Sequence, residues 1–213
     1  MTAPRRLPLA DEFWLFAHHD YSGRPLCAAP ILGAGLASCV LAELWMASLV
    51  NVAQGRVVVV PRPAPPNDPV WQSTLQELAA QPVSYPLREW ISHLARSVGS
   101  GVTARLIDAN LVEEVRSGPF GRRKYVASDP AVGSSPAIML NHMIENAGRL
   151  DYQTALLAGH VLIAGLDSEI VSPDPAVTRN GLRAMVRDLP PDLLSVLSAL
   201  QSVVSAAPLR VNR

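Results

Sequence analysis

One long apolar stretch constrains the fold of this chain more than any other feature of the sequence. From residue 28 to residue 53 the only formally charged residue is Glu43. Residues 31–48 fit a helix that is apolar almost all round, which is typical of a helix buried on every side. The stretch could span a bilayer by length, but it contains Pro30, ends in a β-branched run and has no flanking aromatic belt with a basic cluster. We therefore expect a core helix in a soluble protein, and the most buried helix of the fold.

The single charge in this helix needs a partner if the helix is buried. An unpaired carboxylate in an apolar interior is costly. We therefore expect Glu43 to be hydrogen-bonded or to lie at the edge of the bundle.

The rest of the chain is mostly of helical periodicity, broken by glycine and proline. An amphipathic helix runs from about residue 9 to residue 19, and further helices are predicted over residues 70–80, 86–96, 101–115, 136–148, 152–166, 176–188 and 191–205. Gln54-Gly55 between two β-branched runs indicates a β-hairpin over residues 49–60. Residues 116–126 form a second hairpin or an extended loop. The predicted fold is mainly α: one domain over residues 1–213, a helical bundle surrounded by amphipathic helices, with one or two short β-hairpins.

Composition narrows the class of protein. Hydrophobic residues make up 49% of the 213 residues and charged residues 17%, so the chain is a packed globular protein. Eighteen basic and eighteen acidic side chains cancel, which argues against a broad nucleic-acid-binding surface. The two cysteines, Cys27 and Cys39, lie in apolar surroundings and are expected to be buried free thiols of a protein in the reducing cytoplasm.

The sequence contains few motifs that are typical of enzymes. The five histidines show no HExxH spacing, there is no CxxC, and no P-loop or GxSxG elbow occurs. Gly33-Ala34-Gly35 begins like a dinucleotide-binding motif but lacks the final glycine and the βαβ context, so close helix packing is the better interpretation. The sequence predicts a non-enzymatic protein with no catalytic metal and no cofactor. An enzyme of unrecognised type, assembled only by the fold, stays open as an alternative.

The most informative local feature is a basic segment over residues 116–125. It has no acidic residue, and four cationic residues flank an apolar tip at Phe120: Arg116, Arg122, Arg123 and Lys124. Such a loop suits an anionic membrane surface, because charge attracts it and Phe120 can enter the interface. The alternative is a solvated hairpin whose arginines pair with Glu113, Glu114 or Asp129.

The order of several short segments resembles one known family. They are Leu7-Pro8-Leu9-Ala10-Asp11-Glu12-Phe13, Asp20-Tyr21-Ser22-Gly23, Gly35-Leu36-Ala37-Ser38-Cys39-Val40-Leu41-Ala42-Glu43-Leu44, Gly55-Arg56-Val57, Asn67-Asp68-Pro69, Trp90-Ile91, Arg105-Leu106 with Leu111-Val112-Glu113, and Leu156-Leu157-Ala158-Gly159-His160. In this order and spacing the chain resembles the Golgi phosphoprotein 3 family, in its bacterial branch, over about residues 7–205.

The resemblance implies a mainly α-helical adaptor that attaches peripherally to membranes through phosphatidylinositol 4-phosphate and displays a surface to a protein partner. It implies lipid-binding roles for the membrane loop at about residues 116–125 and for Arg105, which matches a basic position of the headgroup site. The other headgroup positions of the family fall here on Ala28, Ala37, Ser100 and Thr103, so the specific pocket does not carry over.

A nucleic-acid-binding module is the rival interpretation. An apolar helix followed by the hairpin over residues 49–60 has the order of a winged helix. Residues 31–48, however, contain no arginine or lysine, whereas affinity for DNA depends heavily on phosphate contacts. The sequence therefore favours an anionic lipid over nucleic acid as the partner.

Overall fold

Helices dominate the fold, and two small hairpins complete it. The structure is a computed structural model that describes residues 6–62, 67–116, 123–146 and 151–206. Its α-helices are α1 (Leu9–Phe16), α2 (Ala29–Met46), α3 (Pro69–Ala79), α4 (Leu87–Leu94), α5 (Val98–Asp108), α6 (Pro130–Asn146), α7 (Tyr152–Ile163), α8 (Pro175–Val186) and α9 (Pro191–Ala206), with a 3₁₀ turn η1 (Asp167–Glu169). Its antiparallel hairpins join β1 (Val50–Ala53) to β2 (Arg56–Val59) and β3 (Val112–Arg116) to β4 (Arg123–Ala127). The predicted mainly α class is confirmed.

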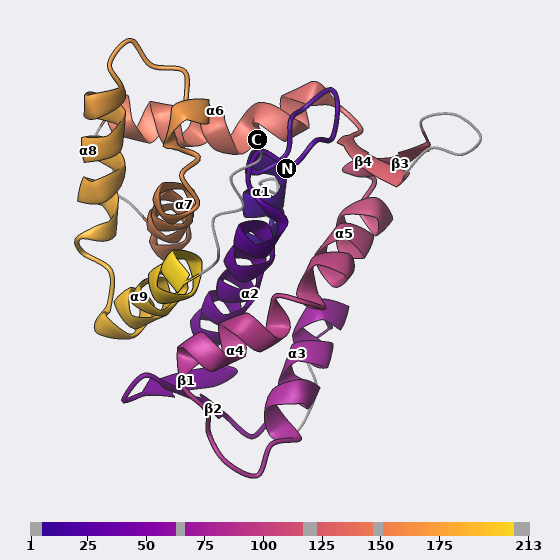
Figure 1. Ribbon diagram of the computed structural model, residues 1–213, viewed down its shortest axis with the longest axis vertical. Helices are drawn as coiled ribbons and strands as arrows, with labels where there is room; N and C mark the ends of the chain where they lie inside the picture. The colour runs from indigo at the N-terminus through magenta and orange to yellow at the C-terminus, as the bar shows by residue number, and fades with distance from the viewer. Residues whose placement is uncertain (1–5, 63–66, 117–122, 147–150, 207–213) are drawn as a thin grey trace, which may run out of the picture.

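Two central helices organise the bundle. Figure 1 shows α2 running through the middle of the molecule, with α3, α4 and α5 on one side and α7, α8 and α9 on the other. Helix α1 packs against α2, α5, α6 and α7, and α2 packs against α4, α5 and α9. Residues from both halves of the chain therefore cover the same two helices.

Helix α2 is the core helix that its composition predicts. Every residue from position 34 to position 44 is buried, and the side chains of Leu36, Leu41 and Leu44 are at most 2% exposed. It is the one helix among the described residues that is long and apolar enough to cross a membrane, and here most of it lies inside the protein. Gly35 packs against the ring of Phe13, where a Cβ atom would collide, so the glycines of this segment serve close helix packing.

Helix α1 is even more completely enclosed, which corrects two expectations. All eight residues of α1 are buried, including Asp11 and Glu12, whereas the ends of α2 are partly exposed. The periodicity predicts an amphipathic helix, and it places α2 as the most buried helix. Both fail for one reason: the polar side of α1 is covered by charged partners from α5 and from the N-terminal segment instead of by water.

The first hairpin follows the sequence closely. Gln54 and Gly55 have φ angles of 52° and 70° and join β1 to β2 as a two-residue turn. Positive φ at both turn residues gives the twist that antiparallel strands prefer. The dipeptide therefore predicted the presence of this hairpin, and the structure adds its register, in which Ala53 pairs with Arg56.

Two element boundaries differ from the expectation. The helix predicted over residues 101–115 is α5, which begins at Val98, contains Gly99 and ends at Asp108. Asn110 then takes a φ of 56°, and Val112 begins strand β3. Helix α6 begins at Pro130 instead of residue 136, because the Asp129 carboxylate accepts a 2.8 Å hydrogen bond from the Ala131 amide and caps it.

Candidate functional site

The β3–β4 hairpin carries the basic segment that the sequence singles out. Figure 1 shows it projecting from the helical body beyond the end of α5. Its register pairs Arg116 with Arg123 and Val115 with Lys124. Because side chains alternate along a strand, Arg116 and Arg123 lie on one face, and Lys124 and the 44%-exposed Val115 lie on the other. Both faces of the distal end are thus basic.

Charge is distributed unevenly along this hairpin. The side chains of Arg116 and Arg123 are 65% and 63% exposed. Their Nε atoms lie 3.5 Å and 3.4 Å from the same carboxylate oxygen, Oε1 of Glu114. Two like charges directly opposite each other on a sheet are destabilising, and a single shared, exposed carboxylate offsets this only weakly. The solvated-hairpin alternative includes pairing of these arginines with Glu114, and that pairing is present, but two exposed cations still share one anion.

The base of the hairpin is fixed to the body. Tyr125 packs against the core, and Gly23, with a φ of 60°, lies so close to the Tyr125 carbonyl that a Cβ atom would not fit. The turn over residues 20–23 therefore packs directly against β4. This attachment positions the distal end as a defined projection.

The predicted lipid-binding residues divide into three groups. The hairpin brings together Arg116, Arg123 and Lys124. Phe120 and Arg122 lie outside the residues that the structure describes. Arg105 lies on α5, in a different environment.

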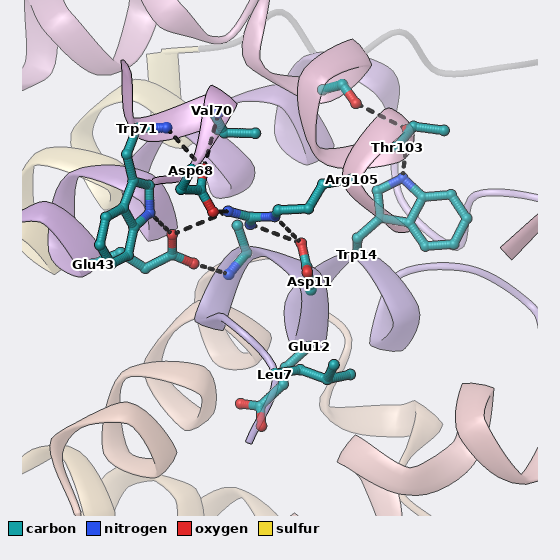
Figure 2. A network of polar contacts seen from close by, with 12 residues as sticks. Leu7, Asp11, Glu12, Trp14, Glu43, Asp68, Val70, Trp71, Thr103 and Arg105 are labelled. Carbon is teal, nitrogen blue, oxygen red and sulfur yellow. Dashed lines mark hydrogen bonds and ion pairs between the residues drawn. The ribbon is translucent and has the colours of Figure 1, made fainter. Parts of the chain in front are cut away.

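Arg105 is the centre of a buried ion cluster, shown in Figure 2. Its Nε and one terminal nitrogen donate to Asp11 Oδ1 at 3.0 Å and 2.7 Å, and its other terminal nitrogen donates to Asp68 Oδ2 at 2.8 Å. Glu43 lies 3.9 Å from the same guanidinium. The Arg105 side chain is 12% exposed and those of Asp11 and Glu43 are 3% exposed. These hydrogen bonds and the ion pair with Glu43 connect α5 to α1, to α2 and to the residue that caps the start of α3.

Glu43 has the partners that its burial requires. One of its oxygens accepts from the Ala10 amide at 2.6 Å and the other from the Trp71 indole N–H at 2.6 Å, so the expected hydrogen bonding is confirmed. Burial raises the pKa of Glu43 to about 7, although Arg105 and the two hydrogen bonds oppose the shift. Burial likewise raises the pKa of Asp11 to about 6 against the pull of Arg105.

The cluster itself was not predicted. The resemblance alone pointed to Arg105, and as a residue of a headgroup site. Two signals were present: Glu43 is an isolated charge in an apolar helix, and Asp68 precedes Pro69 at a helix start, where it caps α3. Neither signal identifies Arg105 as the common partner, because Arg105 is 94 residues from Asp11.

A family model supplies the identification. The model of Golgi phosphoprotein 3 (GPP34) matches residues 9–207, nearly the whole chain. The chain belongs to the Golgi phosphoprotein 3 family. No curated protein sequence matches it.

The positions that the resemblance assigns to a headgroup site lack the expected side chains in this chain. Ala37 is fully buried in α2, and Ala28 is the exposed residue just before that helix. Thr103 accepts from the Trp14 indole at 3.1 Å and donates to the Gly99 carbonyl. Ser100 donates to the Ser97 carbonyl. These positions serve the packing and capping of helices.

One Ser–His pair in this family member resembles catalytic machinery but is enclosed. The Ser38 hydroxyl lies 3.0 Å from His160 Nε2, and His160 Nδ1 lies 2.7 Å from the Leu156 carbonyl. Both side chains are 0% exposed, and burial lowers the pKa of His160 to about 4. A substrate could not reach this pair, so it is a satisfied polar contact between α2 and α7. Among the described residues, no three His, Cys, Asp or Glu side chains are placed to hold a metal ion.

Proposed function

We propose that this protein is a non-enzymatic peripheral membrane adaptor that binds anionic lipid at the cytoplasmic face of a membrane through its β3–β4 hairpin. One observation carries the proposal: the distal end of a projecting hairpin presents Arg116, Arg123 and Lys124 on both of its faces. The carboxylates of the hairpin, Glu113 and Glu114, lie nearer its base. Membership of the Golgi phosphoprotein 3 family supports the same role.

Charge alone gives this hairpin a moderate affinity for an anionic membrane surface. Each basic residue close to an anionic surface contributes about 1 kcal/mol. Three of them contribute about 3 kcal/mol, which is roughly a hundredfold in partitioning. That suffices for weak, reversible attachment, in which Phe120 supplies interfacial insertion, but not for stable anchoring.

Headgroup selectivity should be low. Arg105, the one cation at a matched headgroup position, already binds Asp11 and Asp68. Ala37 and Thr103 offer no cation in place of the family's arginines. We therefore propose that this protein responds to surface charge more than to phosphatidylinositol 4-phosphate itself.

The fold argues against the winged-helix alternative. The helix that would enter a DNA groove is α2, and every residue from position 34 to position 44 is buried. A recognition helix must expose the face that reads the groove. The helix-plus-hairpin order therefore serves the core of the bundle.

Vesicle co-sedimentation tests the proposal. The wild type, the triple variant Arg122→Ala/Arg123→Ala/Lys124→Ala and a matched triple variant of exposed arginines on α4 and α8, Arg88→Ala/Arg183→Ala/Arg187→Ala, all meet the same vesicles. One series raises phosphatidylglycerol in phosphatidylcholine, and a second supplies equal charge as phosphatidylinositol 4-phosphate. Circular dichroism checks that each variant is folded.

The hairpin variant should lose binding by roughly a hundredfold, while the matched variant, with the same change in net charge, should bind like the wild type. Binding should weaken as salt rises, and the two lipid series should give similar curves. Equal binding by the hairpin variant and the wild type would show that the hairpin is only a solvated projection.

A further inference from the structure

A second surface feature lies near the hairpin but is separate from it. A cavity of about 380 Å³ lies at the C-terminal end of α1, between the following loop, α6 and the segment around η1. Its volume is in the range of small-molecule sites. Asp20 lies in this loop, and its carboxyl occupies space left by Gly133 of α6, where a Cβ atom would lie 2.7 Å from Oδ1.

Large apolar side chains form part of the wall of this cavity and surround its mouth. Leu15 and Phe16 form part of the wall from the buried helix α1. At the outside, Ile138 is 63% exposed and Val171 is 90% exposed. Large apolar side chains gathered around a cavity favour an apolar ligand or the apolar part of one.

The polar groups of the cavity are mostly hydrogen-bond acceptors once their existing bonds are counted. His18 Nδ1 lies 2.7 Å from the Trp14 carbonyl, so it carries the proton and Nε2 is left as an acceptor; burial lowers the pKa of His18 and keeps it neutral. The Ser134 hydroxyl donates to the Pro130 carbonyl, and its lone pairs remain. The Asn141 amide donates one hydrogen bond to Glu145, which leaves its carbonyl oxygen and its second N–H.

Two carboxylates complete the lining, the partly buried Asp20 and the exposed Glu169. Asp20 and Glu169 both line the cavity, and no arginine or lysine does. Among the described residues neither carboxylate forms a hydrogen bond or ion pair; only His19 interacts electrostatically with Asp20. Burial raises the pKa of Asp20, although the neighbouring His19 opposes the shift. His19 contributes a donor, because its Nδ1 accepts from the Tyr21 and Ser22 amides.

We propose that this cavity binds a primary ammonium group carried on an apolar chain. The ammonium supplies three donors and a positive charge to Asp20, Glu169 and the remaining acceptors, and the chain lies along Leu15, Phe16 and Ile138. A bare metal ion is a poorer match, because no three His, Cys, Asp or Glu side chains of the described residues converge on one point. The site stands independently of lipid binding by the hairpin.

Calorimetric titration of the full-length protein with hexylamine tests this assignment. Hexyltrimethylammonium has the same charge and chain but no N–H donor, and hexanol has the chain without the charge. The variant is Asp20→Asn/Glu169→Gln. A matched variant, Asp188→Asn/Glu113→Gln, makes the same charge change at exposed positions outside the cavity, and Ala137→Leu fills the cavity without changing charge.

Hexylamine should bind with a Kd at or below about 1 mM, and at least tenfold more tightly than either analogue. The cavity variant and Ala137→Leu should each weaken hexylamine binding at least about tenfold, since charge-assisted hydrogen bonds and apolar contact are both lost, while the matched variant binds normally. Equal affinity for hexanol, or an unchanged cavity variant, overturns the proposal.

The same chemistry has two sources, a soluble amine or the headgroup of an aminophospholipid. Vesicles of phosphatidylcholine with and without phosphatidylethanolamine separate them. Extra binding to phosphatidylethanolamine that disappears in Asp20→Asn/Glu169→Gln identifies the lipid. Hexylamine binding without that extra membrane binding identifies a soluble amine.

Discussion

Replacing Arg105 with methionine removes the one positive charge of the buried cluster and keeps most of the side-chain volume. The change deletes three hydrogen bonds, two to Asp11 and one to Asp68. It also removes the cation 3.9 Å from Glu43. Asp11 and Glu43, with side chains 3% exposed, then lie in the interior as carboxyls with no opposite charge from α5.

The expected loss of stability is large. Removing one partner of a buried ion pair costs about 3–5 kcal/mol, because the other charge stays buried and uncompensated. A domain of this size loses about 2–4 °C in Tm per kcal/mol, so the melting temperature should fall by roughly 6–20 °C. The loss should be smaller at acidic pH, since protonation of Asp11 and Glu43 removes the uncompensated charges.

Thermal and urea unfolding followed by circular dichroism measure this loss. Arg179→Met is the matched control, because Arg179 also donates two hydrogen bonds to one carboxylate, Asp167, but its side chain is 51% exposed. An exposed pair contributes about 0–1 kcal/mol. If Arg105→Met costs no more than Arg179→Met at neutral pH, the cluster does not stabilise the fold and the reasoning about its burial is wrong.

Three further outcomes are expected. The pKa of Glu43 is raised to about 7 in the folded protein from an ordinary 4.5. Its protonation therefore stabilises the fold fully below about pH 4.5, and this stabilisation is lost as pH rises through 7. Urea unfolding at several pH values should show this fall in the free energy of unfolding in the wild type and not in Glu43→Gln. Gly35→Ala should destabilise by about 1–3 kcal/mol, because the new Cβ collides with Phe13, and a melting temperature equal to the wild type would refute that contact. Gly99→Ala should instead stabilise α5 by about 0.5–1 kcal/mol, because its Cβ would meet Leu36 at an ordinary 3.6 Å; a fall in melting temperature would contradict this.

Local features of the sequence predicted the elements well where short-range physics decides. The apolar composition of residues 31–48 predicted the buried helix α2, and Gln54-Gly55 predicted the first hairpin. Family resemblance over nearly the whole chain agrees with the match over residues 9–207. The boundary errors have local causes as well: Gly99 is tolerated inside α5, and Asp129 caps α6 seven residues before Pro136.

The candidate sites also differ in whether their residues are neighbours in the sequence. The basic segment is contiguous, so the sequence itself brought Arg123 and Lys124 together in one predicted hairpin or loop. The role of Arg105 depended instead on Asp11, which lies 94 residues away, and the amine cavity depended on Asp20 meeting the side of α6 at Gly133.

The sequence by itself determined most of the helical segments, the burial of α2 and where positive charge gathers, because hydrophobic periodicity, turn residues and adjacency act within a few residues. Only the tertiary structure decided that α1 is buried with its acidic residues, and that Arg105 pairs with Asp11 while Arg6 pairs with Glu12. Burial of a charge is favourable only when a partner comes from another element at hydrogen-bonding distance. No pattern within one helix carries that information, since it arises when distant segments pack together.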